Sequence, residues 1–109
     1  MPGNVRKKNG AAYRRAVAEV RARHEGCWIC EAFGRDPAID YSLPPSDPGA
    51  FQVDHLVPVS KGGSLYDPAN LAATHRRCNQ WRKAKSVAEV MRIARGIDAE
   101  PAPRWSTDW

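Results

Sequence analysis

The sequence predicts a small α+β domain in which a β-hairpin and several short helices surround a metal site. Three observations carry this prediction. Apolar residues recur at helical spacing near the N-terminus, and an alternating run rich in β-formers covers residues 51–59. Two pairs of metal-ligand residues, each with a gap of two, lie on either side of that run. A chain of 109 residues with 42% hydrophobic residues suits one domain with a modest core, which a bound metal would help to stabilise.

The N-terminal part begins with a basic, polar segment, residues 1–10, which we expect to be a flexible tail. Residues 11–24 lack Gly and Pro and carry Tyr13, Val17 and Val20 at helical spacing, so they predict a helix that ends before Gly26. Residues 34–49 hold four prolines and predict a long irregular loop.

The middle of the chain predicts a hairpin followed by a helix. Residues 51–59 form the first strand, and Pro58 restricts its end to a sheet edge. After two turns, residues 70–74 supply the return strand and residues 76–85 a basic helix.

The C-terminal part predicts one more helix, residues 86–96, which begins with a Ser86–Glu89 capping box and ends at Gly96. We expect the domain to span residues 11–96 and residues 97–109 to form a tail. The two tryptophans of that tail either dock on the domain or bind a partner.

The charge distribution favours a polyanionic partner. The chain carries 17 Lys and Arg against 12 Asp and Glu, a net charge of +5. Residues 1–25 and 61–85 are basic, and the stretch between them, residues 26–60, is acidic. Ordinary solvated helix faces are the alternative explanation. No apolar run is long enough for a membrane span or a secretory signal, so we expect no membrane association and a cytoplasmic location in a bacterial host.

The cysteines predict a structural zinc site. Three cysteines make a disulfide framework improbable, whereas Cys27-x-x-Cys30 and His75-x-x-Cys78 supply the four donors of a tetrahedral zinc ion. A site with four protein ligands has no open position for water, so it would be structural. The alternatives are that the cysteines are small buried residues, or that His75 belongs to a catalytic set instead.

A compound motif resembles the HNH endonuclease family. It consists of Val53-Asp54-His55-Leu56-Val57-Pro58, Lys61-Gly62-Gly63-Ser64, Asn70-Leu71 and Cys78-Asn79. The resemblance implies a ββα-metal (His-Me finger) fold with a zinc knuckle and flanking helices. The small, zinc-bearing layout resembles the stand-alone HNH proteins of phages and prophages. Some of these act with the DNA-packaging terminase, so terminase subunits are candidate partners.

Phosphodiester chemistry agrees with the roles that the resemblance implies. Asp54 and Asn79 offer the hard oxygens that a catalytic Mg²⁺ or Mn²⁺ prefers. His55 is the expected general base, on the opposite strand face from Asp54, and Asn70 is expected to hold the loop that orients it. The expected phosphate contacts are Arg76, Arg77, Arg82 and Lys83.

The predicted function is therefore metal-dependent DNA cleavage by a monomer or weak dimer, with one strand nicked per active centre. The resemblance makes phage DNA packaging one candidate setting, beside restriction and mobile-element movement. The alternatives are a non-catalytic zinc-dependent DNA-binding module, and an accessory protein of a packaging or restriction complex that binds through the tail of residues 105–109.

Overall fold

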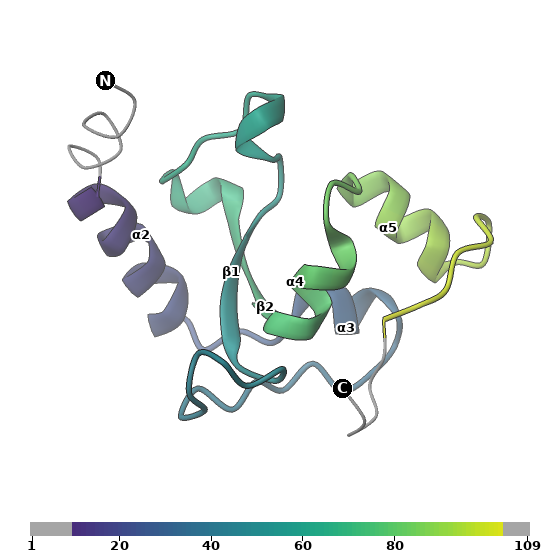
Figure 1. Cartoon of the computed structure of the whole chain (residues 1–109), viewed down its shortest axis with the longest axis horizontal. Coiled ribbons are helices and arrows are strands. Elements are labelled where there is room, and N and C mark those ends of the chain that lie inside the picture. The colour runs from purple at the N-terminus through teal and green to yellow at the C-terminus, as the bar shows by residue number, and fades with distance from the viewer. Residues whose placement is uncertain (1–9, 104–109) are drawn as a thin grey trace.

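The computed structural model describes residues 10–103 and is built around a two-stranded antiparallel sheet with helices on both sides (Figure 1). In chain order, the described elements are α2 (Gly10–Ala22), α3 (Trp28–Ala32), β1 (Phe51–His55), the 3-10 turns η1 (Val59–Lys61) and η2 (Pro68–Asn70), β2 (Leu71–His75), α4 (Arg76–Arg82) and α5 (Val87–Ala94). Strands β1 and β2 pair with Val53 opposite Ala73, and α4 follows β2 directly. The predicted α+β class and the hairpin-helix order are confirmed.

The first strand, α4 and α5 are shorter than predicted. The first strand ends at His55 and not at residue 59, because Pro58 lacks an N–H and leads into the η1 turn. The helix predicted for residues 76–85 ends at Arg82, because Lys83 adopts a φ of 51° that no α-helix accommodates. The capping box is present as predicted: the Ser86 side chain accepts from the Glu89 N–H, and the Glu89 carboxylate accepts from the Ser86 N–H.

A first apolar cluster joins α2 to the hairpin. Ala16 and Val20 lie four residues apart on one face of α2 and are buried against Leu71 and Ala73 of β2. Of the three predicted apolar positions only Val20 is buried here, while Tyr13 and Val17 are partly exposed and Ala16 supplies the second buried residue. This contact places α2 along one side of the hairpin (Figure 1).

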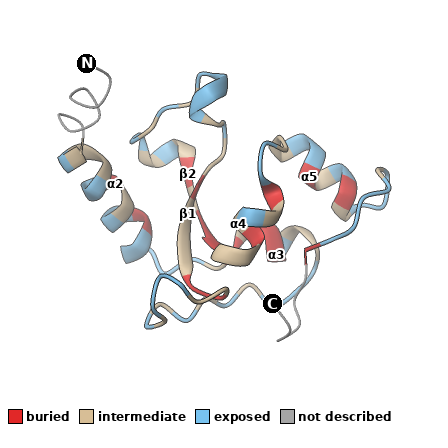
Figure 2. Ribbon diagram, in the orientation of Figure 1, coloured by how far each residue is buried: buried red, intermediate tan, exposed pale blue. Residues whose placement is uncertain are grey.

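A second apolar cluster surrounds the cysteines on the other side of the sheet, where α3, α4 and β2 meet (Figure 2). Ile29 is fully buried there, and Phe33 packs edge-on against Trp81 with ring centroids 5.6 Å apart. Ile39 contacts both clusters. The segment predicted as an irregular loop, residues 34–49, therefore connects the two halves of the core.

The chain after α5 folds back onto α4. The Trp81 indole donates to the carbonyl of Pro101 at 2.8 Å, and Lys85 forms an ion pair with Glu100 at 3.1 Å. The domain boundary at residue 96 stays a prediction. The tail predicted for residues 1–10 and the tryptophans at 105 and 109 fall outside the described residues, apart from Gly10, which begins α2. None of the described helices is long and apolar enough to cross a membrane.

Candidate zinc centre and active site

Four predicted zinc ligands converge in the second cluster. The ligand atoms of Cys27, Cys30, His75 and Cys78 all lie within 4.8 Å of one another, and all four residues are buried. The cysteines form no disulfide. Two thiols come from the start of α3, and the other two ligands come from the end of β2 and the first turn of α4. Short spacing within each pair and hairpin closure between the pairs thus create one four-donor site, which fits tetrahedral zinc.

The orientation of His75 supports a ligand role. Its Nε2 lies 2.8 Å from the carbonyl of Ala38, so Nε2 carries the proton and donates. Its Nδ1 then faces the thiols, 3.4 Å from Sγ of Cys30 and 3.9 Å from Sγ of Cys78. A backbone carbonyl behind a histidine ligand fixes its tautomer and orientation. His75 therefore lies in the cysteine cluster, and not in the pocket described below.

Close contacts among these groups shift their pKa values in opposite directions. Hydrogen bonds from Cys30 and Cys78 hold the pKa of the Cys27 thiol far below its ordinary value. Hydrogen bonds with Cys27 and Cys30, followed by burial, raise the pKa of Cys78. Burial opposes protonation of His75, but hydrogen bonds with the two cysteines of α3 outweigh it and raise the pKa of His75 to about 10. A zinc ion at this site would replace such protons.

A separate pocket of about 280 Å³ lies over the end of β1. Asp54, His55, Asn79 and Lys83 line it together with the loop residues Pro58, Val59 and Leu65. Strand alternation directs the Asp54 side chain toward α4, whereas the His55 ring lies parallel to that of Tyr13 on α2. Both nevertheless border the same pocket, because it spans the end of the strand.

His55 is held in one tautomer. Its Nε2 lies 2.9 Å from the carbonyl of Leu65, so this nitrogen donates and Nδ1 carries the lone pair. Within residues 10–103, no hydrogen bond to Nδ1 is present. A ring with one nitrogen anchored and the other available as an acceptor is suited to remove a proton from water.

Asn70 holds the loop that supplies the Leu65 carbonyl. Its side-chain oxygen accepts from the N–H of Val57 at 2.9 Å, and its amide donates to the carbonyls of Val57 and Ser64, each at 3.0 Å. Gly63 lies inside this arrangement, and a Cβ there would overlap the Val57 carbonyl. Asn70 thus closes the loop across its base, and only glycine fits at position 63.

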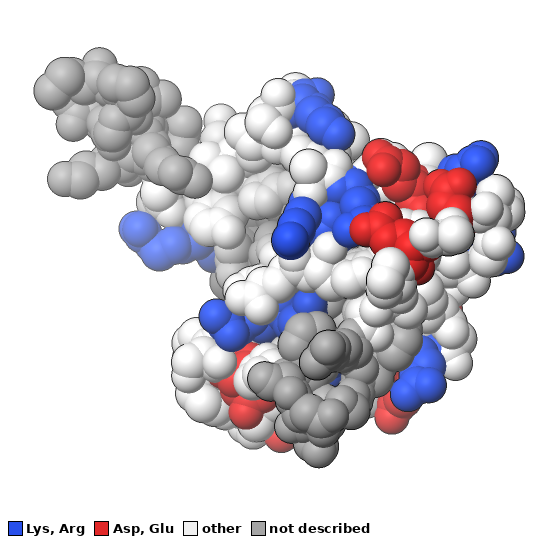
Figure 3. Space-filling model, turned by 45° about the vertical axis from the view of Figure 1, so that its right-hand side comes forward, with Lys and Arg blue, Asp and Glu red and all other residues white. Residues whose placement is uncertain are grey.

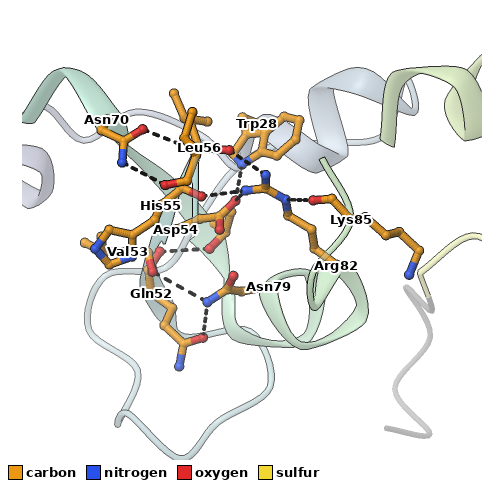
Figure 4. A network of polar contacts seen from close by, with 12 residues as sticks. Trp28, Gln52, Val53, Asp54, His55, Leu56, Asn70, Asn79, Arg82 and Lys85 are labelled. Atoms are coloured by element: carbon orange, nitrogen blue, oxygen red, sulfur yellow. Dashed lines mark hydrogen bonds and ion pairs between the residues drawn. The ribbon is translucent and has the colours of Figure 1, made fainter. Parts of the chain in front are cut away.

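Asp54 lies in a network of polar contacts (Figure 4). Its Oδ2 accepts from the Trp28 indole at 2.8 Å and from the Arg82 guanidinium at 2.6 Å. Its Oδ1 has no hydrogen-bond partner among the described residues. One carboxylate oxygen is therefore held by the protein while the other stays available for a ligand.

Asn79 presents its oxygen in the same way. The Nδ2 of Asn79 donates to the side-chain oxygen of Gln52 at 2.8 Å and approaches the Val53 carbonyl at 3.5 Å. Its Oδ1 points toward Asp54 in Figure 4 and accepts from no described residue. One carboxylate and one amide oxygen bordering a single pocket fit a hard divalent cation such as Mg²⁺.

Arg82 does not lie where its predicted phosphate contact requires. Its side chain is only 1% exposed and forms an ion pair with Asp54 inside the domain. The guanidinium also donates to the carbonyls of His55, Leu56 and Lys85, at 2.7 to 2.9 Å. We therefore correct the prediction for this residue: Arg82 links α4 to the end of β1, and four of its N–H donors are already used within the domain.

The other predicted phosphate contacts lie in two places. Lys83 is exposed at the pocket and forms no side-chain hydrogen bond or ion pair with any described residue. Arg76 and Arg77 lie at the opposite end of α4, where Arg76 donates to the Ser46 carbonyl at 3.2 Å and Arg77 borders a hollow beside His75. Figure 3 shows basic side chains spread over one face of the molecule rather than gathered in one patch.

Sequence reasoning missed two groups at the site: the Trp28 indole, which binds Asp54, and the Leu65 carbonyl, which orients His55. The Trp28 contact leaves no signal in the spacing, because its partner lies 26 residues away. A backbone carbonyl has no sequence signature at all. Only the motif residues on either side of Leu65, the loop glycines and Asn70, indicate that this loop has a defined conformation.

A zinc-type ligand cluster joined to a hairpin-helix unit, with Asp, His and Asn around one pocket, defines a small ββα nuclease-type domain. Residues 27–85, more than half of the chain, match the HNH endonuclease family. The chain therefore belongs to that family. The searches of curated proteins and of solved structures returned no match.

Proposed function

We propose that this protein is a metal-dependent DNA endonuclease that hydrolyses phosphodiester bonds and nicks one strand at each active centre. Membership of the HNH endonuclease family supports a nuclease acting on DNA. The observation that carries the proposal is the state of His55. Its Nε2–H is bound by the Leu65 carbonyl, and its Nδ1 is left as an acceptor beside Asp54 and Asn79.

In this proposal, His55 is the general base. Nδ1 takes a proton from a water molecule as that water attacks the phosphorus, and the bond to the leaving 3′ oxygen breaks. The Leu65 carbonyl stabilises the imidazolium that results, because it accepts the opposite N–H. Asn70 acts through the loop and is a positioning residue.

Asp54 and Asn79 would hold the catalytic divalent cation, Mg²⁺ or Mn²⁺. When bound, such a cation neutralises the charge that develops on the phosphate and on the leaving oxygen. Two protein oxygens leave room in its coordination shell for substrate and water. The four ligands at Cys27, Cys30, His75 and Cys78 would hold a structural zinc ion, separate from this centre.

DNA would lie across the pocket with its backbone near Lys83, an exposed residue whose side chain has no partner in the described region. Arg76 and Arg77 would contact phosphates further along the strand, at the far end of α4. Such contacts position a backbone without reading its sequence.

Nicking of supercoiled plasmid by the zinc-loaded protein tests the proposal. We expect nicking with Mg²⁺ or Mn²⁺, none with EDTA, and a loss of at least about 100-fold in His55→Ala. His24→Ala is the matched control, because His24 is an exposed histidine outside the pocket. No nicking by a folded wild-type protein that still binds DNA would reject catalysis in favour of a DNA-binding module.

The resemblance to phage-type HNH proteins further supports a role in phage DNA packaging, with terminase subunits as partners. Nicking that increases when a terminase subunit is added would support this part of the proposal. Nicking that is unaffected by the subunit, together with no co-purification, would reject it.

A further inference from the structure

We infer that Trp28 is a positioning residue: its indole N–H selects which carboxylate oxygen of Asp54 faces the catalytic cation, and so couples the zinc centre to the active site. This inference rests on the proposed function and assigns a role to a residue outside the motif of residues 53–79. Trp28 is the first residue of α3, between the zinc ligands Cys27 and Cys30. The zinc ligands on either side of Trp28 therefore fix the position of its backbone.

The contact itself is specific. The Trp28 indole donates to Oδ2 of Asp54 at 2.8 Å, and the Arg82 guanidinium donates to the same oxygen at 2.6 Å (Figure 4). The guanidinium carbon lies 5.3 Å from the centroid of the indole ring, so the two donors also contact each other. Two donors on Oδ2 leave Oδ1 as the oxygen that can bind a cation.

The bond matters because, among the described residues, the Asp54 carboxylate accepts from only two donors, the Trp28 indole and the Arg82 guanidinium. Without the indole N–H, only the hydrogen bond from Arg82 would hold Oδ2. The carboxylate could then rotate more freely about its Cβ–Cγ bond. Hydrogen bonds behind a metal ligand typically contribute about 10- to 100-fold to metal affinity. We expect an effect of that size from Trp28.

The chain offers a matched control in Trp81. Trp81 also packs against the cysteine cluster and also donates one indole hydrogen bond, to the Pro101 carbonyl at 2.8 Å. It makes no contact with Asp54. Trp28→Phe and Trp81→Phe therefore remove the same chemical group from two tryptophans that both pack against the cysteine cluster, and only the first one releases Oδ2.

The test measures Mn²⁺ binding to zinc-loaded protein by electron paramagnetic resonance of the free ion, together with zinc content and thermal unfolding. In Trp28→Phe we expect the Kd for Mn²⁺ to rise about 10- to 100-fold with one zinc per chain retained. Trp81→Phe is expected to keep the wild-type Kd within about threefold. Should Trp28→Phe fail to fold, 3-benzothienylalanine at position 28 keeps the ring shape, replaces the N–H by sulfur, and is expected to give the same rise.

The inference is overturned if Trp28→Phe keeps the wild-type Kd for Mn²⁺, or if Trp81→Phe raises that Kd by the same factor. The proposed function stands in either case. Asn79→Ala identifies the site, because it must also weaken Mn²⁺ binding. A wild-type protein that binds no Mn²⁺ outside the zinc site would overturn the proposed function, and this inference with it. The Mg²⁺ concentration for half-maximal nicking should rise in parallel with the Kd, with the rate at saturation changed less.

Discussion

Replacing Arg82 with methionine should destabilise the domain and leave its electrostatic attraction to DNA nearly unchanged. The Arg82–Asp54 pair is buried, with side-chain exposures of 1% and 7% and a distance of 2.6 Å. Removal of one partner from a buried pair costs about 3–5 kcal/mol, because the other charge stays buried without compensation. Against a total stability of about 5–15 kcal/mol, this loss is large.

The assay is urea unfolding at a fixed free zinc concentration, followed by circular dichroism, with a salt titration of DNA binding beside it. Arg92→Met is the matched control. Arg92 also pairs with an aspartate, Asp98 at 3.1 Å, but the two side chains are 53% and 40% exposed. Its loss should cost less than about 1 kcal/mol.

A double-mutant cycle separates the pair from its surroundings. Asp54→Asn with Arg82→Met removes both charges, so the double variant should lose less stability than the two single variants combined, by about 1–3 kcal/mol. Wild-type stability in Arg82→Met would refute this reasoning. So would a fall of about one unit in the salt slope of DNA binding without destabilisation, which is the signature of a phosphate contact.

Three further predictions follow from the site. Zinc binding should weaken as the pH falls from 8 to 6, by at least about 100-fold per unit, because His75, with a pKa raised to about 10, and Cys78, with a raised pKa, must each release a proton when the metal binds; competition with a chromophoric chelator measures it, and a slope of zero contradicts it. Lys83→Gly should stabilise the fold by about 1 kcal/mol, because a non-glycine residue at φ 51° and ψ −123° is strained. The same change should weaken DNA binding. Chemical unfolding measures the first effect and a binding titration the second, and a less stable variant would contradict the first. Gly63→Ala should reduce nicking at least about tenfold with zinc retained, because the added methyl displaces the Val57 carbonyl from Asn70; plasmid nicking checks this, and wild-type activity would contradict it.

Local signals account for the parts of the fold that sequence reasoning predicted well. The capping box at Ser86 and Glu89 and the two-residue gap of each ligand pair involve residues three apart. Backbone geometry alone brings such neighbours together. The hairpin followed from alternation and turn residues in the same way. These features could therefore be predicted without knowing how the rest of the chain folds.

The end of the first strand and the end of α4 were harder to place. At Pro58 the chain can extend the strand or enter a turn, and the structure shows the turn. At Lys83 the helix can continue or end in a residue with positive φ, and the structure shows the helix end. The segment of residues 34–49 had no periodic pattern at all. Its structural role came from single contacts, such as the Ala38 carbonyl behind His75.

By itself, the sequence determined the class of the domain and the zinc-type ligand set, because residue type and short spacing decide those features. The resemblance to HNH endonucleases indicated Asp54, His55 and Asn79, which the structure places at one pocket. Tertiary structure decided which polar groups are in water and which are paired. Arg82 and Lys83 are adjacent cations, yet one is buried on Asp54 and the other is exposed at the pocket. Burial and pairing depend on contacts across 26 to 28 residues of chain, and charge or spacing along the sequence does not encode such contacts.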